Sequence, residues 1–310
     1  TSRGLGDVYK RQDINAPMMK KWQNGLAENY SNAYIRNIYG LFQKSLDLAV
    51  KLGLLNKNVA KQVGNVKKQK KKIDFWTQKE FEKVISTFDI SDYYEHYTFI
   101  IIWLLFMTGL RLGEAQALEW TDINFEDKTL TVSKSMYYKS ANEFYVTEPK
   151  TRAGNRTIAL DDVTISYLAE WKSVQGRNVV SKYVLSYNGL PTNKSTTKHI
   201  IERHSKLAGV HTIKTHALRH SHASLLISLG ENAIVVRDRL GHEDVETTLG
   251  TYGHLYPNTN IEVAKKLNNL ISVKKDDTIT RNFISNQFVK NRQSGCNNIS
   301  LDCEEKEWDS

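Results

Sequence analysis

The sequence predicts a mainly α-helical protein with a small antiparallel β-sheet. Over most of its 310 residues, apolar side chains recur every three or four positions, which is the period of an amphipathic helix. Three neighbouring runs, 128–138, 143–149 and 155–160, are instead rich in β-branched and aromatic residues, and turn-forming residues separate them. These runs predict a three-stranded antiparallel meander. Helical periodicity returns after residue 161.

Residues 13–66 are predicted to form a small helical domain. Its strongest element follows Ser31, a good N-cap residue, and carries apolar side chains at helical spacing up to Gly53. A run with five lysines in six positions comes next. Since like charges repel, residues 67–72 are predicted to be an extended linker, either a plain spacer or a segment that lies along DNA phosphates. The lysines concerned are Lys67, Lys68, Lys70, Lys71 and Lys72.

A second, larger domain is predicted over residues 73–270. Thr77, followed three residues later by Glu80, forms a capping-box pattern that starts a helix. The apolar segment 95–108 reads as a buried helix that ends at Gly109. Residues 1–12 are expected to be a non-native leader, and 271–310 a polar, loosely ordered tail.

The composition favours some classes of binding partner and excludes others. The chain has 43 Lys and Arg against 34 Asp and Glu, a net charge of +9, which suits a protein that meets a polyanion. The longest apolar run is too short to span a bilayer, so no membrane partner is expected. Its two cysteines, Cys296 and Cys303, lack the spacing of a zinc site and suit a reducing cytoplasm.

The stretch "THALRHSHASLLISLG" (215–230) combines a basic start with an apolar remainder. With Thr215 or Thr212 as the N-cap, His216 and Arg219 lie three positions apart on one face of the first turn. Cations at a helix N-terminus are unfavourable because the positive end of the helix dipole lies there. An anion should therefore bind at this end, and a phosphate suits the amides, the guanidinium and the imidazole together.

Two further segments carry candidate residues. In "TGLRLGEAQALEW" (108–120), Gly109 can take a positive φ and leaves Arg111 at the head of a helix, with Glu114 one turn on. Arg111 either forms a purely structural ion pair with Glu114 or is held by Glu114 for a ligand. In "DRLGHEDVETTLGTYGHLYP" (238–257), His242 follows a helix and Tyr252 lies on a short amphipathic helix.

Four ordered segments, "TGLRLGE", "HALRH", "LGH" and "TYGHLYP", resemble the catalytic domain of the tyrosine recombinases, the phage-type integrases. The resemblance covers roughly residues 73–260, and 13–66 resembles the end of the family's core-binding domain. It implies a helical core-binding domain, a catalytic domain of the DNA breaking-rejoining fold, and a site-specific recombinase of a phage or mobile element. Such an enzyme cuts and rejoins DNA through a 3′-phosphotyrosine. On this resemblance, the chain is expected to begin inside the core-binding domain.

The resemblance also implies roles for single residues. Tyr252 would be the nucleophile, and Arg111 and Arg219 would bind the non-bridging phosphate oxygens. His216 would assist proton movement at the tyrosine hydroxyl, whose ordinary pKa is about 10. His242 would donate a hydrogen bond to the phosphoryl oxygens.

Other assignments leave alternatives open. Lys150, between the second and third predicted strands, matches the family's general acid, with Lys139 and Arg152 as rivals. Glu114 would orient Arg111. Tyr256 is a rival nucleophile because His242 and Tyr252 are ten positions apart, whereas many relatives use nine.

The implied chemistry needs no metal or nucleotide cofactor. Expected partners are double-stranded DNA with attachment or core sites, further copies in a tetramer on DNA, and an excisionase or host DNA-bending protein. The expected location is the cytoplasm. Three alternatives are a zinc protein using His216 and His220, a non-catalytic DNA-binding relative, and a type IB topoisomerase.

Overall fold

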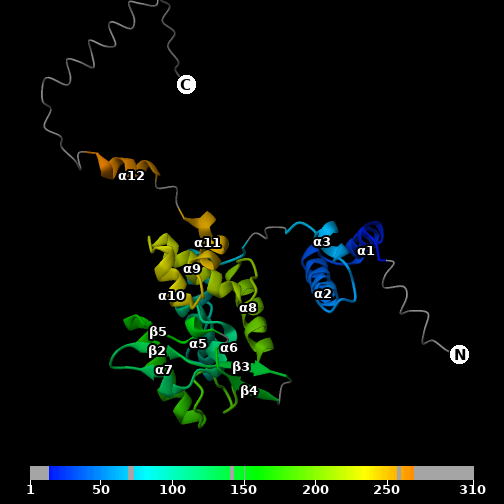
Figure 1. Ribbon diagram of the computed structural model, residues 1–310. Coiled ribbons are helices and arrows are strands. Elements are labelled where there is room, and N and C mark those ends of the chain that lie inside the picture. Colours follow the sequence, from blue (N-terminus) through cyan, green and yellow to red (C-terminus); the bar gives the residue numbers. More distant parts are fainter. Residues whose placement is uncertain (1–13, 69–72, 140–142, 150, 257–259, 269–310) are drawn as a thin grey trace, which may run out of the picture. The chain divides into compact units, whose positions relative to one another are not determined.

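The computed structural model describes residues 14–68, 73–139, 143–149, 151–256 and 260–268, and it is mainly helical with small antiparallel sheets, as predicted (Figure 1). The predictions made for the leader 1–12, for Lys70, Lys71, Lys72 and Lys150, and for the tail 271–310 lie outside these residues. Within the described ranges, every helix is too short or too polar to cross a bilayer.

Three helices form the N-terminal part: α1 (Ala16–Asn29), α2 (Asn32–Lys51) and α3 (Val59–Val63). The Ser31 side chain accepts a hydrogen bond from the amide of Tyr34, so it caps α2 as predicted. Tyr39 is fully buried and donates its hydroxyl hydrogen to the carbonyl of Ala60, which ties α2 to α3. After α3, Lys67 and Lys68 are exposed in a segment without helix or strand.

The larger part holds most of the helices. They are α4 (Gln78–Ile85), α5 (Tyr93–Thr108), α6 (Leu112–Ala117), α7 (Asp162–Asn178), α8 (Lys194–Ala208), α9 (Ala217–Ser228), α10 (Ala233–Leu240) and α11 (Val245–Tyr252). Helix α5 contacts α6, α7, α8 and α9 (Figure 1). Its sequence is apolar on every side, and most of its side chains are buried, so it forms the centre of the core. A further helix, α12 (Asn260–Leu267), follows later in the chain.

Helix ends follow the predicted local rules. Thr77 and Glu80 form the capping box that starts α4. Gly109 ends α5 and Gly241 ends α10, both with a positive φ. At each glycine a Cβ atom would approach neighbouring atoms to within 2.7 Å, so both the backbone conformation and the packing require glycine.

The predicted meander is wrong in its topology, although its pairing is antiparallel. Two sheets form from five strands: β1 (Ile123–Asn124), β2 (Thr129–Val132) and β5 (Arg156–Ala159) in one, and β3 (Ser135–Tyr138) and β4 (Phe144–Thr147) in the other. The run 128–138 therefore splits into β2 and β3, and β2 pairs directly with β5.

The split has a physical cause. Leu130 of β2 is buried in the main core, whereas Met136 of β3 belongs to a separate apolar cluster. Between them, Lys134 forms ion pairs with Glu119 and Asp122. One continuous strand could not bury both apolar side chains in these two places and also direct Lys134 toward the carboxylates.

Candidate active site

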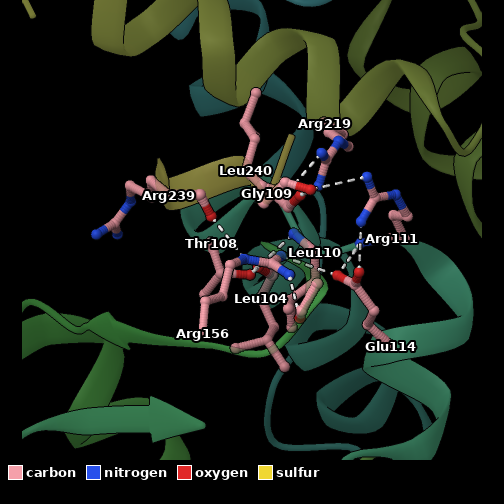
Figure 2. A network of polar contacts seen from close by, with 12 residues as sticks. Leu104, Thr108, Gly109, Leu110, Arg111, Glu114, Arg156, Arg219, Arg239 and Leu240 are labelled. Atoms are coloured by element: carbon pink, nitrogen blue, oxygen red, sulfur yellow. Dashed lines mark hydrogen bonds and ion pairs between the residues drawn. The ribbon is translucent and has the colours of Figure 1, made fainter. Parts of the chain in front are cut away.

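The turn between α5 and α6 places Arg111 at the head of α6. Its Nη1 lies 2.7 Å from Glu114 Oε1 (Figure 2). Its Nη2 donates to the carbonyl of Gly241 at 3.2 Å. The Arg111 side chain keeps 43% of its surface exposed, while Glu114 is buried. The predicted ion pair between Arg111 and Glu114 is present, and it leaves the Arg111 side chain partly exposed.

Glu114 also binds a second arginine, Arg156 on β5. Arg156 Nη2 lies 2.9 Å from Glu114 Oε2, and both side chains are buried. Burial alone would raise the pKa of Glu114, but the hydrogen bond and charge of Arg156, with the hydrogen bonds from Arg111, hold that pKa below its usual range. Glu114 is thus an ionised carboxylate shared by two guanidinium groups (Figure 2).

Helix α9 starts differently from the prediction, because neither Thr212 nor Thr215 caps it. His216 occupies the N-cap position in a helical conformation and makes no side-chain cap hydrogen bond. The amides of Ala217 and Leu218 bond instead to the carbonyls of Lys214 and Thr215. A backbone turn therefore replaces the side-chain cap.

Arg219, in the first turn of α9, is 2% exposed. Its Nη1 donates to the carbonyl of Gly109 at 2.8 Å and its Nη2 to that of Leu240 at 2.6 Å, so the ends of α5 and α10 hold it (Figure 2). Burial and the charge of Arg111 lower its pKa to about 9, so the guanidinium stays charged at neutral pH. Among the described residues, no carboxylate forms an ion pair with Arg219.

Tyr252, the last residue of α11, is 1% exposed. Its hydroxyl oxygen lies 2.8 Å from Nδ1 of His220, on α9. Burial raises the pKa of Tyr252 to about 12, against the opposing effect of Arg219 and Arg111. Burial, together with His216 and Arg219, lowers the pKa of His220 to about 4. At neutral pH the phenol and the imidazole are therefore both uncharged.

The two predicted histidines lie around this pair. His216 packs edge-on against His220, with ring centroids 4.9 Å apart, and His242 stacks on the Tyr252 ring at 6.5 Å. His242 Nδ1 is hydrogen-bonded to Thr248 at 2.8 Å. Burial and the nearby Arg219 lower the pKa of both histidines, that of His242 to about 4. It is His220, and not His216, that reaches the tyrosine hydroxyl.

The remaining predicted residues lie in other segments of the chain or outside the described ranges. The rival Tyr256 follows the 3-10 turn Gly253–Leu255. Lys139 is ion-paired with Glu143, and Arg152 lies in the connection from β4 to β5 that also carries Lys150. Lys150 itself lies outside the described residues. No three His, Cys, Asp or Glu side chains gather as a metal site would need in the part of the chain that the structure describes.

Sequence reasoning missed two residues of this site. His220 belongs to the segment "HALRH" but was considered only as a zinc ligand, although it lies four positions after His216, at one-turn spacing. Arg156 lies in the strand segment "NRTIAL", where a charged residue reads as solvent-facing. No signal along the chain links Arg156 to Glu114.

Comparison with known proteins identifies the family. Residues 74–259 match the family model described as the phage integrase family. The chain is 35% identical over 282 residues to the ICEBs1 integrase of Bacillus subtilis (strain 168), covering 87% of this chain and 76% of that protein. It is 23% identical over 286 residues to the integrase of Staphylococcus phage L54a, covering 83% and 80%.

A solved structure shares the fold. The Tn1549 transposon integrase in complex with transposon right end DNA superposes with a TM-score of 0.68 at 20% identity, covering 84% of this chain and 86% of that one. The predicted family, fold class and class of enzyme are confirmed. The chain belongs to the phage integrase family, as a tyrosine site-specific recombinase of a phage or another mobile element.

Proposed function

We propose that Tyr252 is the nucleophile with which this recombinase cuts and rejoins DNA through a 3′-phosphotyrosine. The observation that carries the proposal is the placement of its hydroxyl, which is buried, hydrogen-bonded to His220, and close enough to Arg219 and Arg111 for their charges to act on its pKa. A covalent intermediate divides one strand exchange into two easier steps.

Arg219 and Arg111 are proposed to bind the non-bridging oxygens of the phosphate under attack. Arg219 carries a buried charge with carbonyl partners, and Arg111 is partly open to a ligand. Positive groups aimed at these oxygens stabilise the charge that grows in the transition state. His242 and His216 would act as neutral hydrogen-bond donors beside them, and Glu114 would orient Arg111.

Lys150 is proposed as the general acid that protonates the leaving 5′ oxygen. The support comes from its described neighbours in the connection from β4 to β5. The carbonyl of Ala153 approaches Gly241 so closely that a Cβ atom there would lie 2.7 Å away, and Gly241 accepts a hydrogen bond from Arg111. This connection therefore packs beside the arginine site.

DNA is the substrate, and we propose that this chain acts on double-stranded attachment or core sites as a tetramer in the cytoplasm. An excisionase or a host DNA-bending protein would act as an accessory partner. Lys67 and Lys68 are exposed, which supports a linker that follows the DNA backbone together with Lys70, Lys71 and Lys72. Relatives named as integrases and transposases of mobile elements support this assignment.

The test is the formation of a covalent adduct. The protein is incubated without divalent metal with a nicked duplex that carries the junction sequence from the ends of its own element, and products are separated on a denaturing gel. We expect an adduct from wild type and Tyr256→Phe and none from Tyr252→Phe. Loss in Tyr256→Phe alone would move the nucleophile to Tyr256.

Two alternatives give different results in the same assay. DNA binding without an adduct from any variant would favour a non-catalytic DNA-binding relative. Relaxation of supercoiled DNA without strand exchange would favour an activity of the topoisomerase IB type.

A further inference from the structure

We propose that His220 is the general base that removes the proton from Tyr252 during DNA cleavage. The inference rests on the proposed function, in which Tyr252 is the nucleophile. As the tyrosine oxygen forms its bond to phosphorus, its O–H bond breaks and the proton moves to Nδ1 of His220. The bond from phosphorus to the 5′ oxygen breaks, and that oxygen takes a proton from the general acid, Lys150. In rejoining, a 5′ hydroxyl attacks phosphorus and gives its proton to the neutral amine of Lys150. The bond from phosphorus to the tyrosine oxygen breaks, and the His220 imidazolium returns its proton to that oxygen.

One ring nitrogen of His220 lies within hydrogen-bond distance of the tyrosine oxygen that attacks phosphorus. Nδ1 of His220 and the hydroxyl oxygen of Tyr252 are 2.8 Å apart, the distance over which a general base takes a proton. A neutral phenol is the hydrogen-bond donor when Nδ1 is unprotonated, and the ring hydrogen then sits on Nε2. This tautomer accepts the proton without any change of side-chain conformation.

The packing of α9 fixes His220 in this position. Its neighbours along the chain, Arg219 and Ser221, are both buried, and the Ser221 hydroxyl oxygen accepts a hydrogen bond from the amide of Trp76. Arg219 is held by carbonyls at the ends of α5 and α10. The hydrogen bonds on both sides of His220 hold α9 in the orientation that directs His220 toward Tyr252.

Among the described residues, His216 packs on the ring of His220 and makes no hydrogen bond to the Tyr252 hydroxyl. Three further groups that could take the proton have other partners. Glu114 is bound by Arg156 and Arg111, and Nδ1 of His242 is bound to Thr248. Asp244 caps α11 through the amide of Thr247. Among the described residues, His220 is the titratable group with a hydrogen bond to the Tyr252 hydroxyl.

The charges around His220 suit a base that works only when DNA is bound. Without DNA, burial and the nearby His216 and Arg219 favour the neutral imidazole, which is the form that can accept a proton. A bound phosphate adds negative charge beside Arg219, which raises the basicity of His220. Proton uptake is thereby favoured in the complex in which Tyr252 attacks.

The first test compares substitutions that separate proton transfer from hydrogen bonding. In His220→Asn, the amide oxygen can still accept a hydrogen bond from Tyr252 but cannot take its proton at neutral pH. We expect the single-turnover rate of adduct formation to fall at least about 100-fold, with DNA affinity unchanged. His199→Asn, on the exposed surface of α8, should keep the wild-type rate. Added imidazole should restore part of the rate in His220→Ala and none in Tyr252→Phe.

A second substrate separates the base from the acid. In a duplex with sulfur in place of the bridging 5′ oxygen at the cleavage site, the thiolate leaves without needing a proton. Lys150→Ala should then recover most of its rate, whereas His220→Asn should remain slow. A wild-type rate in His220→Asn on both substrates would refute the role of His220 as general base, while Tyr252 would remain the nucleophile. No adduct from the wild-type protein on either substrate would overturn the nucleophile as well.

Discussion

The N-termini of α6 and α9 both carry an arginine next to the site, but they balance its charge in opposite ways. At α6, Arg111 has Glu114 one turn on, and the buried Arg156 binds the same carboxylate. At α9, Arg219 and two histidines lie together in the first turn, and the described residues provide no carboxylate partner for Arg219. At the N-terminus of α6 a carboxylate neutralises the arginine charge. Among the described residues, no carboxylate does so at the N-terminus of α9.

This difference between the two helix ends indicates that a phosphate would be bound more strongly by its charge at α9 than at α6. Positive charge at a helix N-terminus is unfavourable in the free protein, and burial makes it more so. Two carbonyl groups orient Arg219 but cannot neutralise it. In the proposed mechanism, a DNA phosphate would supply the missing negative charge. Arg111, which is already paired with Glu114, would contribute mainly hydrogen-bond geometry.

The largest effect is expected on the rate of DNA cleavage when the planar guanidinium of Arg219 is replaced. Arg219→Lys keeps the positive charge but loses the planar arrangement that binds two carbonyls and a phosphate together. The rate of adduct formation should fall about 100- to 1000-fold. The measurement is single-turnover cleavage, with Arg237→Lys, a partly buried arginine of α10 that is ion-paired with Asp238, as a matched control. A smaller loss than in Arg111→Lys would contradict the ranking of the two arginines.

The second effect tests the balance at α6 through stability. Glu114→Gln leaves buried Arg156 without its carboxylate, so the free energy of unfolding should fall by about 3 kcal/mol. Arg156→Met should also destabilise the protein, because it leaves buried Glu114 with the half-exposed Arg111 alone. Urea denaturation followed by circular dichroism measures both.

Arg111→Met serves as the comparison for these variants. Its side chain is 43% exposed, so its loss should cost less stability than the loss of Arg156. Equal destabilisation by Arg111→Met and Arg156→Met would show that the buried pair does not dominate at α6.

The sequence predicted those parts of the structure that depend on neighbouring residues. Ser31, the Thr77 capping box and Gly109 act within one helical turn, and each helix end lies where they place it. The pair Arg111 and Glu114 is also local, at three positions apart. Such features follow from spacing and side-chain chemistry alone.

Contacts between distant residues could not be read in the same way. Arg156 and Glu114 are 42 positions apart, and His220 and Tyr252 are 32 apart. The pairing of β2 with β5 likewise depends on which apolar cluster each strand covers. The family resemblance predicted Tyr252 and Arg219 as site residues, but the partner of the tyrosine hydroxyl is seen only in the structure, where His220 of α9 meets Tyr252 of α11.

A third effect is the loss of stability at low pH. Unfolded histidines have a pKa near 6.5, whereas the pKa of His220 and His242 in the folded protein is about 4. Between these values the unfolded chain binds more protons, so stability is full above about pH 6.5 and falls as the pH decreases toward 4. Urea denaturation at several pH values should show a weaker dependence in His220→Asn. An unchanged dependence would mean that protonation at α9 does not limit stability.

The smallest predicted effect is stabilisation by a simple anion. Inorganic phosphate should bind at the α9 end, because Arg219 is there and no carboxylate of the described residues pairs with it. At ten times its dissociation constant it should add roughly 1.4 kcal/mol to the free energy of unfolding, seen as a higher melting temperature. Arg219→Lys should lose most of this gain, whereas Arg237→Lys should keep it. Glu114→Gln sharpens the comparison further: it makes α6 resemble α9 by freeing Arg111 and Arg156 from their carboxylate, so phosphate should stabilise this variant more than wild type. An equal gain in both proteins would mean that the charge balance at the two helix ends does not govern anion binding.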